Sequence, residues 1–147
     1  MHEAASTMGT VAHVIQLAVA PVFLLTAIGT LLSVMTNRLA RIIDRARRLE
    51  GRLESAPPES VAGIHALLAT LSQRAKLINR AITLSTVAAL LVCTVIAILF
   101  LGDFLRFTII VPVAFLFVTA MLSLVVALLS FLREIFIATG SLRIGPL

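Results

Sequence analysis

The chain has 147 residues, of which 60% are apolar and only 13% charged, and its net charge is +5 at neutral pH. Its length suits one domain, but a composition this apolar excludes an ordinary water-soluble globular protein. Cys93 is the only cysteine, so the sequence offers neither a disulfide framework nor a thiol cluster for a metal. We therefore interpret the chain as a membrane protein, and its excess of arginine first as a signal of membrane topology.

Three apolar runs, each long enough to cross a hydrocarbon core of about 30 Å, predict three transmembrane helices. No acidic or basic residue lies deep inside any of them, which argues against a proton or coupled-ion pathway. The predicted segments, in chain order, are an extracytoplasmic amino terminus at 1–10, a first span at 11–34, a cytoplasmic hairpin at 35–80 with its turn near 55–58, a second span at 81–101, an outer turn at 102–106, a third span at 107–132 and a frayed cytoplasmic tail at 133–147.

The segment between the first two spans has the pattern of two amphipathic helices. Apolar residues recur in alternating threes and fours, which places them on one face of each helix. They are Leu39, Ile42, Ala46, Leu49 and Leu53 in the first half, and Val61, Ile64, Leu68, Leu71, Ala75 and Ile78 in the second. Pro57 and Pro58 interrupt the helix between them. The fold class predicted is an all-α membrane protein with an antiparallel, coiled-coil-like helical hairpin between its first and second spans.

Beside the first apolar face runs an arginine ridge, which we define as Arg38, Arg41, Arg45, Arg48 and Arg52. Arg38 and Arg41 lie where the helix leaves the membrane and are candidates for binding lipid phosphates. Arg52 lies about 21 Å further along a straight helix than Arg38. That distance exceeds a Debye length of about 8 Å, so lipid attraction does not explain the distal arginines. They face an acidic partner, line a vestibule or form a solvated face with local ion pairs such as Asp44 with Arg41 and Arg48.

The distribution of basic residues predicts the orientation. Nine of the twelve Lys and Arg residues fall in the hairpin segment, namely Arg38, Arg41, Arg45, Arg47, Arg48, Arg52, Arg74, Lys76 and Arg80. The predicted tail adds Arg133 and Arg143, the outer turn has only Arg106, and the amino terminus has none. By the positive-inside rule, the hairpin and the carboxyl terminus are expected in the cytoplasm and the amino terminus outside.

The run MTNRLARIIDR at 35–45 resembles the signature of a family of small bacterial membrane proteins catalogued as a domain of unknown function. The shared features are the Asn-Arg pair, the two arginines that follow and the aspartate after paired isoleucines. This resemblance implies a multi-pass protein of the bacterial inner membrane with three spans, and it implies no activity.

Polar residues in and near the spans are candidates for helix packing or for a pore lining. Small hydroxyl side chains at helical spacing serve more often in packing. These candidates are Asn37, Thr83, Thr86, Thr94, Thr119 and Ser123. Asn37 stands where the first span becomes the hairpin and is expected to cap a kink or to fix the register between subunits.

The sequence contains no motif for catalysis, a cofactor or a metal, so we do not expect an enzyme. Nucleic acid is an unfavoured partner because the basic helix lacks interleaved aromatic residues. One functional hypothesis is a homo-oligomer enclosing an ion-conducting channel with a basic cytoplasmic vestibule. The alternative is a non-conducting scaffold whose hairpin recruits an acidic protein. The expected partners are thus other copies of the chain, anionic lipid headgroups and an acidic cytoplasmic protein.

Overall fold

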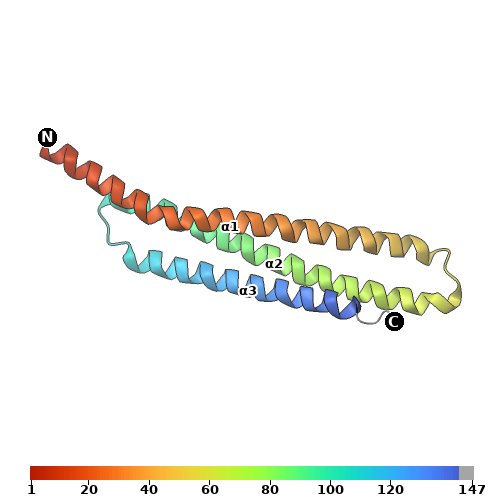
Figure 1. Cartoon of the computed structure of the whole chain (residues 1–147). Coiled ribbons are helices and arrows are strands. Elements are labelled where there is room, and N and C mark those ends of the chain that lie inside the picture. The colour runs from red at the N-terminus through yellow and green to blue at the C-terminus, as the bar shows by residue number, and fades with distance from the viewer. Residues whose placement is uncertain (143–147) are drawn as a thin grey trace. The chain divides into compact units, whose positions relative to one another are not determined.

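The structure is a computed structural model that describes residues 1–142 and consists of three α-helices (Figure 1). They are α1 (His2–Leu53), α2 (Pro58–Leu105) and α3 (Ile110–Leu142). The described residues include no strand. The predicted all-α class is confirmed.

All three helices contain a stretch long and apolar enough to cross a membrane. Helix α1 has 52 residues and α2 has 48, so at 1.5 Å per residue they measure about 78 Å and about 72 Å. A hydrocarbon core is only about 30 Å thick, so both helices must continue beyond it. The chain is therefore a multi-pass membrane protein in which α1 and α2 extend outside the membrane.

The chain divides into two compact units, and every helix contributes to both of them. The first unit consists of Met1–Leu31 and Ser85–Val125. The second unit consists of Leu32–Leu84 and the carboxyl-terminal part of the chain from Val126 onward. The first unit thus holds the amino-terminal halves of α1 and α3 with the carboxyl-terminal half of α2, and the second unit holds the α1–α2 turn.

The core of the first unit is built from small and β-branched side chains. Its fully or almost fully buried residues are Val14, Ala18, Ile28, Ser85, Ala88, Val92, Val95 and Ala120. Large apolar residues point outward instead, among them Phe23 and Phe115, each 72% exposed. Exposing such side chains to water is unfavourable, whereas lipid accepts them. Small and β-branched residues inside and large aromatic residues outside suit close helix packing in a bilayer.

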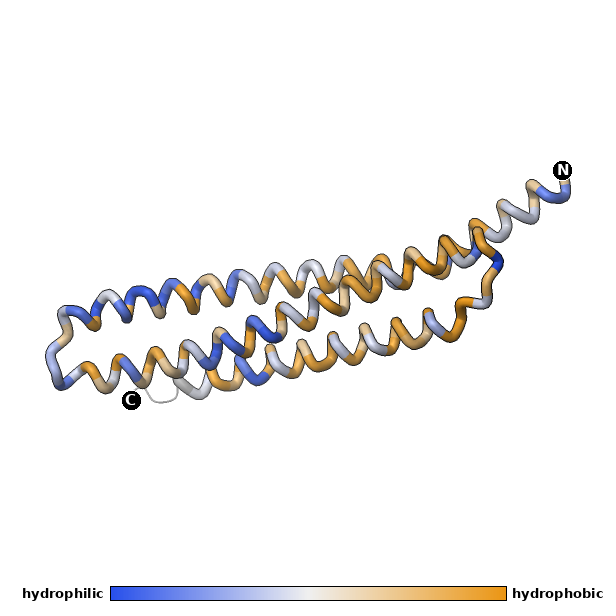
Figure 2. Tube along the Cα trace, turned by 180° about the vertical axis from the view of Figure 1, so that it is seen from behind, coloured by the Kyte–Doolittle hydropathy of each residue, from blue (hydrophilic) through white to orange (hydrophobic). Residues whose placement is uncertain are grey.

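The second unit buries the apolar faces that the sequence predicts for α1 and α2. All eleven of those residues are half-buried or buried, and Ile42, Leu71 and Ile78 are the most enclosed. Figure 2 shows hydrophilic positions gathered on either side of the α1–α2 turn, whereas apolar positions dominate the helices of the first unit. The alternation of threes and fours therefore identifies the inward face correctly.

The turn between α1 and α2 is formed by the residues around Pro57. Helix α1 ends at Leu53 and α2 begins at Pro58, whose missing N–H is harmless at the first helical position. Ser60 donates hydrogen bonds to the Pro57 carbonyl from both its backbone N–H and its Oγ, each at 3.0 Å. Glu59 lies in the first turn of α2, where the helix dipole favours a negative charge.

Two segments differ from the sequence-based expectation. Helix α2 continues through Gly102 to Leu105, so the second turn occupies 106–109 rather than 102–106, with Arg106 at a positive φ of 56°. Helix α3 continues past 132, and the expected frayed tail is helical as far as Leu142. Apolar periodicity persists there and Gly140 alone does not end a helix. Arg143 and the Gly145-Pro146 pair lie outside the described residues.

A buried glutamate held by two arginines

A carboxylate on α3 is completely buried in the second unit. Glu134 has 0% exposed surface. Ala127 and Ser130 lie on the same face of α3, seven and four residues earlier, and both are also buried. Glu134 therefore belongs to the inward stripe of α3. An ionised carboxylate in such a position requires cationic or hydrogen-bonding partners.

Arginines from the other two helices provide those partners. Arg74 on α2 donates a hydrogen bond from Nε to Oε1 of Glu134 at 2.9 Å. On α1, Nη2 of Arg38 lies 3.1 Å from Oε2 of the same carboxylate. That distance defines an ion pair, although Oε2 accepts no well-aligned hydrogen bond from the described residues. We take the contact as ionic, because charge attraction depends less on angle than a hydrogen bond does.

The Arg38 guanidinium has a second partner on α3. Its carbon atom lies 5.6 Å from the centre of the Phe131 ring, within the range of a cation–π interaction. Phe131 and Glu134 are three residues apart and so share one side of the helix. Arg38 therefore contacts α3 through both an ion pair with Glu134 and a cation–π interaction with Phe131.

The cluster joins all three helices and carries a formal charge of +1, from Arg38 and Arg74 against Glu134. The Arg74 side chain is 14% exposed and that of Arg38 is 34% exposed, while Glu134 is sealed. Removing one partner of a buried ion pair typically costs about 3–5 kcal/mol, because the other charge is left without compensation. The cluster therefore links the three helices of the second unit through charged contacts whose loss is costly.

A hollow of about 240 Å³ opens beside this cluster, still within the second unit. Its lining consists of four arginines and two apolar residues, namely Arg38, Arg41, Arg45, Arg74, Ile42 and Leu71. Arg41 and Arg45 are exposed, whereas Arg38 and Arg74 are half-buried. The structure thus brings the proximal part of the arginine ridge together with a cation from α2.

The distal residues of the ridge, Arg48 and Arg52, lie apart from the four-arginine hollow. Arg48 and Arg52 are exposed and do not line the four-arginine hollow. Arg52 lines another hollow, of about 400 Å³, at the α1–α2 turn with residues such as Leu49 and Pro57. Asn37 is exposed on α1. The ridge is therefore not one uniform surface.

The local ion pairs expected along α1 do not form. In the part of the chain that the structure describes, Arg41, Arg45, Arg48 and Arg52 make no ion pair, and Asp44 makes none either. Exposed pairs gain little in water and lose side-chain entropy, so this outcome is physically reasonable. Apart from Arg38, which pairs with Glu134, the ridge arginines therefore keep their positive charge without an ion-pair partner among the described residues.

Three of the five hydroxyl candidates donate a hydrogen bond to a carbonyl of their own helix. Thr83, Thr94 and Thr119 are exposed, and each donates to the carbonyl four residues earlier, at 2.9, 2.9 and 2.8 Å. Thr86 is exposed and Ser123 is half-buried. A threonine that bonds its own backbone is compatible with a lipid-facing position as well as with a helix interface.

Glu134 is the residue that sequence reasoning missed. The apolar pattern predicts that the third span ends at 132 and that the following residues form a tail, and it indicates only a topological role for Arg74. The available signal was the inward stripe of small residues on α3, which leads through Ala127 and Ser130 to Glu134 at helical spacing. Extending that stripe beyond the apolar run predicts that the Glu134 carboxylate is buried.

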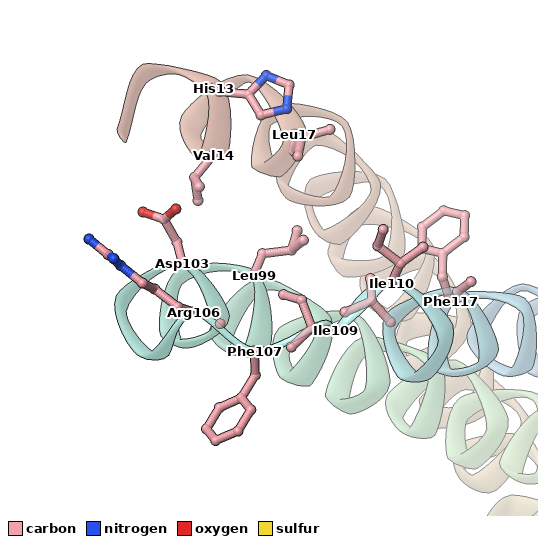
Figure 3. A pocket seen from close by; sticks show the side chains of 13 residues that line it. His13, Val14, Leu17, Leu99, Asp103, Arg106, Phe107, Ile109, Ile110 and Phe117 are labelled. Carbon is pink, nitrogen blue, oxygen red and sulfur yellow. The ribbon is translucent and has the colours of Figure 1, made fainter. Parts of the chain in front are cut away.

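The first unit contains an apolar hollow of about 700 Å³ near the second turn (Figure 3). Its polar residues are His13, Asp103 and Arg106, and most of the remaining lining is apolar. Gly102 avoids a collision here, because a Cβ at this position would lie about 2.9 Å from two carbons of the Ile109 side chain. Within a membrane, lipid chains are the ordinary occupants of such a surface.

No group of three or more potential metal-binding side chains occurs among residues 1–142. The four arginines that line the hollow favour the binding of anions.

The chain matches a family model described as "Protein of unknown function (DUF2721)" over residues 18–144. No curated protein and no solved structure matches it. The match includes all the residues of the buried cluster and of the four-arginine hollow.

Proposed function

Because the chain belongs to the DUF2721 family, whose description assigns no activity, we propose a function from the geometry of its second unit. The protein is a non-conducting scaffold of the bacterial inner membrane, and it docks an acidic cytoplasmic protein through its α1–α2 hairpin. Its amino terminus lies outside and its carboxyl terminus in the cytoplasm, as the positive-inside rule favours. This role involves no catalysis.

The observation that carries the proposal is the unneutralised charge of the distal ridge. Arg48 and Arg52 are exposed, and neither has an ion-pair partner among the described residues. On a hairpin that stands upright they also lie beyond the reach of lipid charge. A complementary acidic surface would gain both orientation and association rate from such a row of cations.

The test is crosslinking in cells from a photoreactive residue placed at the exposed Arg47. We expect one dominant heterologous protein to be captured. The double variant Arg48→Ala/Arg52→Ala should abolish this capture. The matched control, Lys76→Ala/Arg80→Ala, removes the same charge from exposed positions of α2 and should leave it intact. Equal capture by the wild type and the ridge variant would defeat the proposal.

A second candidate is the homo-oligomeric channel, and it rests on the exposed threonines of α2 and α3. A ring of copies would bury Thr94 and Thr119 at its interfaces or along its axis. The intrahelical bonds of these hydroxyls weaken the case, because their donors are already used. Ion flux through liposomes containing the purified protein would favour the channel, and crosslinking only between copies would accompany it.

A further inference from the structure

We propose that the four-arginine hollow of the second unit binds a phosphate group, either of a phospholipid headgroup or of a soluble phosphate compound. The site is distinct from the distal ridge, because neither Arg48 nor Arg52 lines it. The two proposals therefore rest on different residues.

Charge is the first argument. Arg38, Arg41, Arg45 and Arg74 surround about 240 Å³ of space. Among the described residues the acidic partner of this set is Glu134, which contacts only the two inner arginines. Four positive charges against one negative charge leave a formal +3. Like charges held this close repel one another, and a bound anion relieves that repulsion.

The fixation of the inner arginines is the second argument. The Nε of Arg74 is bound to Glu134, which leaves its terminal nitrogens as donors. Arg38 is held by Glu134 and by the Phe131 ring. Both guanidiniums therefore lose little freedom when a ligand arrives, and such preorganisation favours binding.

The outer arginines complete the site. Arg41 and Arg45 follow Arg38 at helical spacings of three and seven residues and remain exposed at the rim. They stay free to close over an anion, while Ile42 and Leu71 form an apolar part of the wall. The site thus combines an inner pair held by Glu134 with an exposed outer pair.

Phosphate matches this arrangement better than a carboxylate does. Arginine binds phosphate through paired, charge-assisted hydrogen bonds, and a phosphate group offers more acceptor oxygens than a carboxylate. One carboxylate, that of Glu134, already occupies the inner side of the two fixed arginines. Four guanidiniums require a ligand with several oxygens on different sides, and the apolar wall accommodates the carbon atoms of a phosphate ester.

The experiment measures thermal unfolding of the full chain in a neutral detergent at constant ionic strength. The added probes are phosphatidylglycerol, inorganic phosphate and diacylglycerol, which has acyl chains but no phosphate. We expect a saturable rise in Tm with at least one phosphate-bearing probe and none with diacylglycerol. A response to phosphatidylglycerol alone identifies a lipid headgroup, and a response to inorganic phosphate identifies the phosphate group itself as sufficient.

The rim variant Arg41→Gln/Arg45→Gln should weaken this binding at least about tenfold, because two charge-assisted contacts are lost. Its control is Arg48→Gln/Arg52→Gln, which removes the same charge from exposed positions outside the hollow and should bind like the wild type. Circular dichroism verifies that both variants fold, and native mass spectrometry counts the bound probe directly. Equal losses in the two variants, equal stabilisation by diacylglycerol, or no saturable response to any phosphate probe would overturn the proposal.

Because the hollow and the distal ridge use different arginines, each proposal can fail alone. Loss of phosphate binding in the rim variant with intact crosslinking would support the hollow and leave the docking role to Arg48 and Arg52.

Discussion

Arg74 on α2 donates a 2.9 Å hydrogen bond to Glu134 on α3, although the two residues are 60 positions apart in the sequence. Arg38 on α1 approaches the other oxygen of the same carboxylate. One sealed carboxylate therefore ties three helices together. Removing one partner would leave a buried charge without compensation.

Glu134→Gln should destabilise the protein strongly. The substitution keeps the shape of the side chain but leaves Arg38 and Arg74 without a negative charge. The expected loss in the free energy of unfolding is about 3 kcal/mol, at the lower end for a buried pair because Arg38 is partly exposed. Denaturant unfolding in mild detergent measures it. As a control, Glu50→Gln at an exposed position should change stability by less than about 0.5 kcal/mol. Equal losses of stability in Glu134→Gln and Glu50→Gln would contradict a structural role for the cluster.

Arg38 and Phe131 should show coupled energies. Their contact at 5.6 Å predicts that Arg38→Gln costs less in a Phe131→Leu background than in the wild type. A double-mutant cycle on unfolding free energies should give a coupling of about 0.5–1 kcal/mol, as expected for a partly exposed cation–π pair. The pair Arg74 and Phe131, for which the structure records no cation–π contact, provides the comparison. Additive effects of Arg38 and Phe131 would show that the ring contact contributes nothing.

Gly102→Ala should destabilise the second turn. The added Cβ would collide with the Ile109 side chain, and such overpacking costs about 1–3 kcal/mol. Combining it with Ile109→Ala removes the collision, so the double variant should be less destabilised than the sum of the two single variants. Gly63→Ala is the matched control, because its Cβ would meet nothing within 4 Å. That change should stabilise α2 by up to about 1 kcal/mol. A Gly102→Ala variant as stable as Gly63→Ala would refute the close contact.

Ser85→Ala should leave stability unchanged or raise it. The Ser85 side chain is completely buried, and its Oγ has no hydrogen-bond partner among the described residues. Removing an unsatisfied buried hydroxyl gains up to about 1 kcal/mol, offset by a small loss of packing. Ser130→Ala is the control, since that Oγ donates to the Val126 carbonyl at 2.9 Å and its removal should cost some stability. Thermal unfolding of the two variants side by side distinguishes them, and a large loss in Ser85→Ala would reveal a partner for this hydroxyl.

Much of the fold could be predicted because its causes are local. Apolar runs identify the three membrane-crossing helices, Pro57 and Pro58 mark the first turn, and the alternation of threes and fours identifies the face that α1 and α2 bury. The second turn was misplaced because Gly102 resembles a breaker, whereas the helix continues through it and Gly102 serves the approach of Ile109. Packing against a neighbour, which local pattern does not reveal, decided that position.

Only part of the candidate site could be predicted from the sequence. The arginine ridge is a periodic feature and could be read directly, including Arg38, Arg41 and Arg45 of the hollow. Glu134 lies beyond the predicted end of the third span, and nothing local to it indicates burial except its spacing from Ala127 and Ser130. Arg74 carries no local sign of its role.

The sequence by itself determined the family, the three membrane-crossing helices and the segregation of positive charge, because composition and periodicity follow directly from the order of residues. Only the tertiary structure decided that Arg38 and Arg74 share Glu134 and that four arginines surround one hollow. These contacts depend on the axial register of three helices. That register is set by packing between residues far apart in the chain, where a shift of one helical turn, about 5.4 Å, would separate every charged pair.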